Sequence, residues 1–228
     1  MEARRRKLTN PRLRSVWERK WRILAGPEFG WHLTEPPPEL VRLMEAGSLP
    51  DGAALDLGCG DGVAAMYIAG FRRPSVGADI AVAAVERATG MASEAGSAAS
   101  FLAAEAPLLP FRSQSFALVF DRGCLQNLTR VVWPAYFQEA ERLLRPGGLL
   151  QLYASRPEFG PPLSPRGIVN RLRALRSARR RHKREFFSRR PMRRALPASF
   201  EPLEVTEFPF RTTDGRKRRF IYILARRR

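Results

Sequence analysis

Between residues 51 and 156, short apolar segments alternate with helical segments, and this alternation constrains the fold more than any other feature of the sequence. Each apolar segment is short enough for a buried strand, and turn residues separate it from the helix that follows. We expect strands at 53–57, 75–79, 99–104, 116–120 and 149–154, with helices at 63–69, 82–92 and 133–144. Repeated strand–helix units predict an α/β fold: a doubly wound, mostly parallel, Rossmann-like sheet with helices on both faces.

The first predicted strand leads into a glycine-rich turn, Leu55-Asp-Leu-Gly-Cys-Gly-Asp-Gly62, after which a helix begins near Val63. Glycine lets the backbone approach a ligand closely, and the start of a helix offers unpaired amides. Asp79 ends the second predicted strand, where an acidic residue can accept hydrogen bonds from ribose hydroxyls. Together these features predict a nucleoside-type cofactor at the carboxyl edge of the sheet, whereas the turn alone would also suit a corner without a ligand.

The details of this turn narrow the class of cofactor. A dinucleotide fingerprint needs a small residue where this chain has Val63. Asp56 adds a negative charge that would repel a pyrophosphate and would suit a cationic ligand. A phosphate-binding P-loop is excluded, because no Gly-Lys-Ser/Thr sequence follows the turn.

The segments on either side of this core have their own patterns. In residues 1–50, Val16, Trp17, Lys20, Trp21 and Leu24 share one face of a predicted helix, and a second short helix includes residues 40–44. Residues 51–156 form the cofactor-binding core. Residues 157–195 combine a proline-containing loop with an arginine-rich helix expected at 167–187, which would form a lid over the acceptor pocket or contact the substrate or a nucleic acid. Residues 196–228 predict two strands, at 200–210 and 218–225, joined as a hairpin by an Asp-Gly turn at 213–215.

Charge is distributed unevenly along the chain, whose formal net charge is +18. Residues 1–22 carry a net +7 and residues 161–228 a net +16, whereas the segment between them carries −5. The arginine-rich 166–194 segment could therefore contact RNA or DNA phosphates, an anionic lipid surface or an acidic substrate, or it could be an ordinary solvated helix face.

Cysteine content and hydropathy bear on the cellular compartment. Two cysteines, Cys59 and Cys124, cannot form a disulfide framework, and a reduced, cytoplasmic protein is expected. No apolar stretch is long enough to span a membrane, and the basic N-terminus lacks the apolar region of a secretory signal.

Several motifs, in the correct order, resemble those of class I S-adenosylmethionine-dependent methyltransferases. Residues 55–62 resemble motif I, Asp79 the ribose-binding acid, Glu105-Ala106 the pair that contacts adenine, 116–121 motif IV, and 143–148 the turn before the fifth strand. Asp121-Arg-Gly-Cys124 and the segment from Trp17 to Leu40 are similar to the thiopurine-methyltransferase-like branch, which acts on small molecules. The resemblance covers roughly residues 16–156 and, more weakly, the last two strands.

The resemblance implies a seven-stranded sheet with an antiparallel last strand and S-adenosyl-L-methionine as the cofactor. It assigns the cofactor contacts to Asp56, Gly58, Cys59, Gly60, Gly62, Asp79, Ile80, Glu105, Ala106 and Asp121, with Trp21 and Trp31 closing the cleft. Asp121, Gln126 and Asn127 are the candidate catalytic residues on the acceptor side, and no metal site is expected.

The chain departs from the family pattern at two places. Glu105 replaces the usual Asp, and Gln126-Asn127 stand where many relatives of that branch carry His, so no general base is evident there. The implied activity is methyl transfer to an O, N or S nucleophile of a small-molecule acceptor. Two alternatives stay open: methylation of RNA or DNA held by the arginine-rich segment, and a non-catalytic protein that binds nucleic acid or a membrane.

Overall fold

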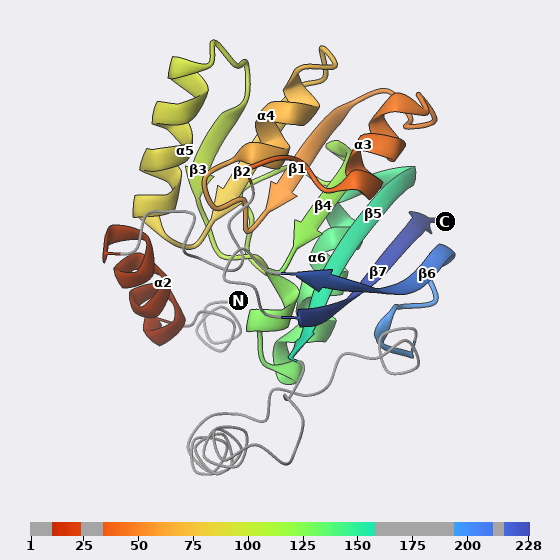
Figure 1. Cartoon of the computed structure of the whole chain (residues 1–228). Helices are drawn as coiled ribbons and strands as arrows, with labels where there is room; N and C mark the ends of the chain where they lie inside the picture. The colour runs from red at the N-terminus through yellow and green to blue at the C-terminus, as the bar shows by residue number, and fades with distance from the viewer. Residues whose placement is uncertain (1–10, 24–33, 158–193, 212–216) are drawn as a thin grey trace.

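The computed structural model describes residues 11–23, 34–157, 194–211 and 217–228 (Figure 1). Its strands are β1 (Ala53–Leu57), β2 (Ser75–Asp79), β3 (Ser100–Ala103), β4 (Phe116–Arg122), β5 (Leu144–Pro157), β6 (Phe200–Arg211) and β7 (Lys217–Arg227). Its α-helices are α2 (Pro11–Ile23), α3 (Pro38–Glu45), α4 (Val63–Ala69), α5 (Val82–Glu94) and α6 (Trp133–Leu143), with two 3₁₀ turns at Leu125–Asn127 and Arg130–Val132.

The seven strands form one sheet in the order β3-β2-β1-β4-β5-β7-β6 (Figure 1). Strands β1 to β5 pair in parallel, whereas β7 is antiparallel to both β5 and β6. The predicted seven-stranded, mostly parallel sheet with an antiparallel last strand is therefore confirmed. The order reverses at β1, whose two neighbours are β2 and β4, and ligands of open α/β sheets bind at the carboxyl ends of strands at such a point.

Two apolar clusters cover the two faces of the sheet. Helix α6 buries Tyr136, Phe137 and Leu143 against one face, together with Leu150 and Ile223. Helices α3 and α4 contribute Leu40, Leu43, Met44, Ala64 and Ile68 to the other face. Because side chains alternate along a strand, β5 supplies Leu150 and Leu152 to the first cluster and Leu149 and Tyr153 to the second.

Most of the predicted elements are confirmed to within two residues, and β5 is the exception, because it covers residues 144–157 where 149–154 was predicted. The helix ends one residue early, at Leu143, and Leu144 is already extended (φ −70°, ψ 140°). Most of the predicted turn at 143–148 instead belongs to the start of β5, where the pairing with β4 shifts register. Gly147, at φ +76°, takes a conformation that side chains rarely adopt, so the Pro-Gly-Gly sequence forms an irregular strand rather than a separate turn.

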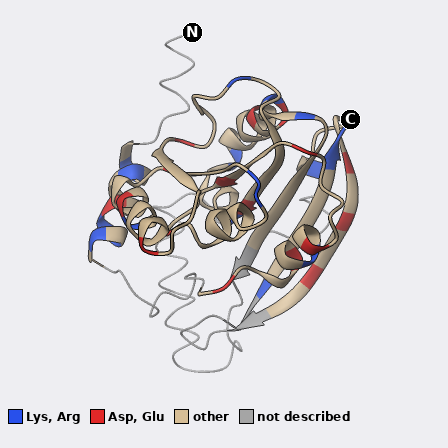
Figure 2. Cartoon of the chain, turned by 90° about the horizontal axis from the view of Figure 1, so that it is seen from above, with Lys and Arg blue, Asp and Glu red and all other residues tan. Residues whose placement is uncertain are grey.

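Some sequence predictions lie outside the described residues: the helix at 167–187, Trp31, and the Asp-Gly turn at 213–215. The pairing of the hairpin strands is described, since Arg211 faces Lys217 in the β6–β7 ladder. Among the described residues, no helix combines the length and apolar character needed to cross a membrane. Lys, Arg, Asp and Glu are spread over several described elements (Figure 2).

Candidate cofactor and acceptor site

The glycine turn after β1 packs directly against the turn after β4. Gly58 has φ +74°, and a Cβ there would lie 2.7 Å from the Cβ of Cys124. The amides of Gly58 and Cys59 both donate to the carbonyl of Ala78 on β2. The turn is thus held between β2 and β4, and it lies beside the Asp121–Cys124 segment as the order of strands predicts.

The other two glycines are needed for different neighbours. A Cβ at Gly60, which has φ +55°, would lie 2.9 Å from the indole ring of Trp21. Helix α2 therefore brings Trp21 against the glycine turn, while its contact with the cofactor stays a prediction. Gly62 (φ +81°) faces protein instead, since its Cβ would lie 2.5 Å from the ring of Phe101 on β3. A close protein neighbour therefore also accounts for the third glycine.

Asp79 closes the turn from the end of β2. Its side chain is 8% exposed and accepts hydrogen bonds from the amides of Gly60 (3.1 Å) and Ala81 (2.9 Å). Burial raises the pKa of this carboxyl group, while the two amides oppose that rise. Ile80, the next residue, is half-buried at the start of the connection to α5.

Asp56 is the most perturbed carboxyl group of the site. It is 3% exposed, and Oδ2 accepts one hydrogen bond, from the amide of Ala65 in α4, at 3.2 Å. Its pKa is raised to about 8, chiefly by burial, with a smaller contribution from the charges of Asp121, Asp79 and Asp61, while the hydrogen bond from Ala65 opposes the rise. Four acidic side chains crowded at one end of the sheet would be stabilised by a cationic ligand.

Asp121 is fully buried at the end of β4 and organises the turn that follows it. Oδ1 accepts from the amide of Cys124 (2.7 Å), while Oδ2 accepts from the amide of Leu125 (3.0 Å) and from Tyr136 Oη (2.6 Å). Burial raises its pKa to about 6 despite these bonds. The side chain thus caps the 3₁₀ turn, and its predicted catalytic role stays a prediction.

The two amides predicted on the acceptor side differ in environment. Gln126 is half-buried and lies close to Gly123, whose Cβ would be 3.1 Å from Nε2. Asn127 is exposed, and its Nδ2 donates to the Gly123 carbonyl at 2.6 Å. Asn127 therefore braces the turn, and the acceptor-side role of both amides stays a prediction.

Glu105 and Ala106 follow β3 and are both buried. The amide of Leu108 donates to the carbonyl of Glu105 at 2.8 Å, so these residues form a tight turn at the predicted adenine edge. Arg14 of α2 reaches Glu105, with 4.0 Å between the guanidinium and the carboxylate. Helix α2 thus contacts the site at both the glycine turn and this second turn.

Arg122 is a functional candidate that the sequence reasoning missed. Its guanidinium lies 5.4 Å from the ring centroid of Phe220, and burial lowers its pKa to about 10, while Tyr153, Asp56 and Glu39 oppose that change. With this pKa the side chain remains cationic at pH 7. The sequence could have indicated this candidate, because Arg122 directly follows Asp121 in the Asp-Arg-Gly-Cys segment.

Comparison with known proteins agrees with this geometry. A family model described as "Methyltransferase domain" matches residues 54–148. The chain is 30% identical over 157 residues to a 2-heptyl-1-hydroxyquinolin-4(1H)-one methyltransferase of Mycobacteroides abscessus, a match covering 66% of this chain and 69% of that protein. This chain belongs to the class I S-adenosylmethionine-dependent methyltransferases. It is also 37% identical over 135 residues to a probable thiol methyltransferase 2 of Arabidopsis thaliana, covering 59% of this chain but only 58% of that relative's length.

A solved structure shares the fold of this methyltransferase. The geranyl diphosphate methyltransferase determined with GPP and sinefungin superposes with a TM-score of 0.65 and 18% identity, covering 95% of this chain and 100% of that one. The residues of this methyltransferase also fit an adenosyl cofactor that carries positive charge. The buried acids Asp56 and Asp79 flank the glycine turn, and their negative charge suits a cationic ligand.

Proposed function

We propose that this methyltransferase transfers a methyl group from S-adenosyl-L-methionine to a sulfur or oxygen nucleophile of a small molecule. The observation that carries the proposal is the buried acidic cluster around Asp56, together with Arg122, which directly follows Asp121 in the chain and whose charge interacts with that of Asp56. When bound, the cofactor supplies a methyl group on a positively charged sulfur. The acids favour that charge, and the arginine favours an acceptor of opposite charge.

On the cofactor side, the roles follow from position. Asp79 would hold the ribose hydroxyls, Glu105 and Ala106 the adenine, and Asp56 the cationic end. Trp21 lies on Gly60 and would exclude water from this end of the cleft. Trp31 is predicted to cover the same end of the cleft, and this role stays a prediction.

On the acceptor side, Arg122 compensates for the missing base. A side-chain amide such as Gln126 cannot accept a proton near pH 7. A cation close by favours the anionic form of a thiol or an acidic hydroxyl, so such an acceptor can arrive already deprotonated. Two relatives are named as a probable thiol methyltransferase and as a 1-hydroxyquinolinone methyltransferase, and both names specify an acceptor of this kind. Positioning and desolvation then supply most of the acceleration.

The test is cofactor-dependent turnover of the whole chain against a panel of thiols, hydroxylated heterocycles, amines and total RNA, followed by the release of S-adenosylhomocysteine. We expect turnover with a thiol or an acidic hydroxyl compound and a rate that falls in Arg122→Gln. Turnover with amines or RNA alone would overturn the proposed acceptor class.

A second candidate function rests on the charge of residues 161–195, most of which lie outside the described residues. Between Pro161 and Ala195 there are 13 Lys or Arg and a single acid, Glu185. If this segment binds RNA, the affinity should fall steeply with salt, with a log–log slope near −0.7 per phosphate contacted on single strands. Deleting residues 166–190 should then abolish RNA binding and spare small-molecule turnover. If the segment covers the acceptor instead, the deletion should abolish turnover, and neither protein should bind RNA.

The compartment is inferred from composition. Cys59 and Cys124 are free thiols, which is consistent with the predicted reduced, cytoplasmic environment.

A further inference from the structure

The turn that carries Glu105 and Ala106 has little regular structure of its own. Between β3 and β4, the described backbone forms one isolated bridge, from Glu105 to Leu108. On one side of the turn, the amide of Ala104 donates to the carbonyl of Asp79 at 2.8 Å. The turn is thus tied to β2 at its start, and a second anchor is needed to fix its other side.

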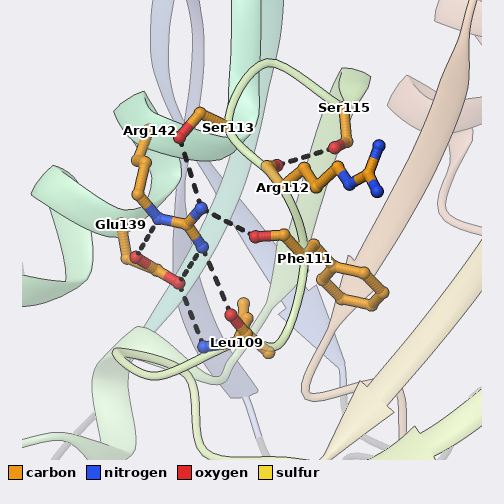
Figure 3. Close-up of polar contacts among 7 residues, drawn as sticks. All are labelled: Leu109, Phe111, Arg112, Ser113, Ser115, Glu139 and Arg142. Carbon is orange, nitrogen blue, oxygen red and sulfur yellow. Dashed lines mark hydrogen bonds and ion pairs between the residues drawn. The ribbon is translucent and has the colours of Figure 1, made fainter.

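The second anchor is a pair of charged side chains on α6, which we call the Arg142–Glu139 clasp (Figure 3). Arg142 donates to the carbonyls of Leu109 (3.2 Å) and Phe111 (2.7 Å). Glu139 accepts from the amide of Leu109 at 3.0 Å. Both polar backbone groups of Leu109 are therefore held, and Leu109 directly follows the Glu105–Leu108 turn.

The two members of the clasp also fix each other. Arg142 Nε and Nη2 donate to the two carboxylate oxygens of Glu139, at 2.8 and 2.7 Å. They are three residues apart, so they lie on the same side of the helix. Only a planar guanidinium can make this two-point contact and still reach two separate carbonyls, because the donors of lysine sit on one nitrogen.

Helix α6 is a firm support for the clasp. Its other side buries Tyr136, Phe137, Ala140 and Leu143 in the first of the two apolar clusters described above. The carbonyl of Arg142 also accepts the amide of Gln114 at 2.8 Å, near the start of β4. The whole connection from Leu109 to Gln114 is consequently attached to the last turn of α6.

We propose that Arg142 and Glu139 are positioning residues that hold the Glu105–Leu108 turn in the conformation that recognises the adenine ring. The inference rests on the proposed function, because adenine is the ligand of that turn only if the cofactor is S-adenosylmethionine. Both side chains would act on the turn through the backbone of Leu109.

The test compares two ligands that differ only at the edge of the base: S-adenosylhomocysteine, and S-inosylhomocysteine, in which a carbonyl replaces the amino group. Calorimetry gives both dissociation constants for the wild type, Arg142→Gln and Arg145→Gln. The last variant is the matched control, since it removes the same charge from a side chain that lies by Gly52 instead. Hydrogen exchange of the 104–111 amides, without ligand, gives a readout that needs no cofactor.

We expect Arg142→Gln to weaken S-adenosylhomocysteine binding by about tenfold and to bring the two ligands to within about twofold of each other, because a loosened turn no longer rejects the wrong hydrogen-bonding pattern. Exchange of the 104–111 amides should be faster in Arg142→Gln and unchanged in Arg145→Gln. Glu139→Gln keeps an acceptor for the amide of Leu109. Its ligand affinities and its exchange rates should therefore lie between those of the wild type and those of Arg142→Gln. If Arg142→Gln is unfolded, Arg142→Lys carries the same comparison.

The possible results distinguish a failure of the positioning role from a failure of the proposed function. Wild-type preference for S-adenosylhomocysteine that persists unchanged in Arg142→Gln and Arg142→Lys would overturn the positioning role. A uniform weakening of both ligands, with the preference kept, would also overturn it, since that result describes a general loss of stability. Failure of the wild type to bind S-adenosylhomocysteine would instead refute the proposed function.

Discussion

Binding of S-adenosylmethionine should release a proton from Asp56. In the structure this carboxyl group is buried, accepts one hydrogen bond at 3.2 Å, and has its pKa raised to about 8. At pH 7 about nine-tenths of such groups carry a proton. A cation bound beside the group favours the carboxylate and brings its pKa back toward the ordinary value of about 4.

The size of the effect follows from that shift. With the pKa of the free protein near 8 and that of the complex well below 6, the dissociation constant should fall about tenfold from pH 6 to pH 7 and about fivefold from pH 7 to pH 8. The sign is fixed by the direction of the shift: the free protein holds more protons than the complex, so a higher pH favours binding.

Calorimetric titration at pH 7 in buffers of different ionisation enthalpy measures the number of protons released, which should be close to one. Asp56→Asn cannot titrate, so its affinity should be lower at pH 8 and should lose most of the pH dependence. An affinity that is constant between pH 6 and pH 8 in the wild type, with no buffer effect, would refute the assignment of Asp56 to the cationic end.

Three further variants probe the rest of the site. Asp79→Ala should weaken S-adenosylhomocysteine binding by roughly 10- to 100-fold, because a charged hydrogen bond contributes about 1.5–3 kcal/mol, and an unchanged calorimetric affinity would rule out the ribose contact. Gly58→Ala places a Cβ 2.7 Å from Cys124 Cβ, so urea unfolding should show a loss of about 1–3 kcal/mol that Cys124→Gly partly restores; no restoration would mean that the clash is not the cause. Asp121→Asn should cost about 1–3 kcal/mol because one amide cannot replace three accepted hydrogen bonds, and a thermal midpoint equal to that of the wild type would show that the cap is dispensable.

The fold was largely predictable because local patterns and tertiary packing agree in the core. The strands at 53–57 and 75–79 are short, apolar and bounded by turns, and the structure places them at those residues. The start of β5 was not predictable, because Pro146 and Gly147 normally end regular structure, while the pairing of Leu144 with Phe116 on β4 is a long-range contact.

The site was predictable where residue type alone carries the chemistry and was not where geometry decides. Asp56 and Asp79 were selected from their spacing, and the structure buries both at the glycine turn, while their contacts with the cofactor stay a prediction. The hydrogen bond from Tyr136 to Asp121 could not be predicted, because Tyr136 comes from a helix 15 residues away. The clasp was invisible for the same reason, because Arg142 reads as an ordinary polar position of an amphipathic helix until the backbone of Leu109 is brought beside it.

The most direct test of the central claim is a crystal structure of the whole chain with S-adenosylhomocysteine. We expect the ribose hydroxyls to contact Asp79 and the base to lie against Glu105 and Ala106. The amino-acid end should lie beside Asp56, under Trp21. A ligand bound elsewhere on the sheet, or a bound ligand whose ribose does not reach Asp79, would contradict this claim.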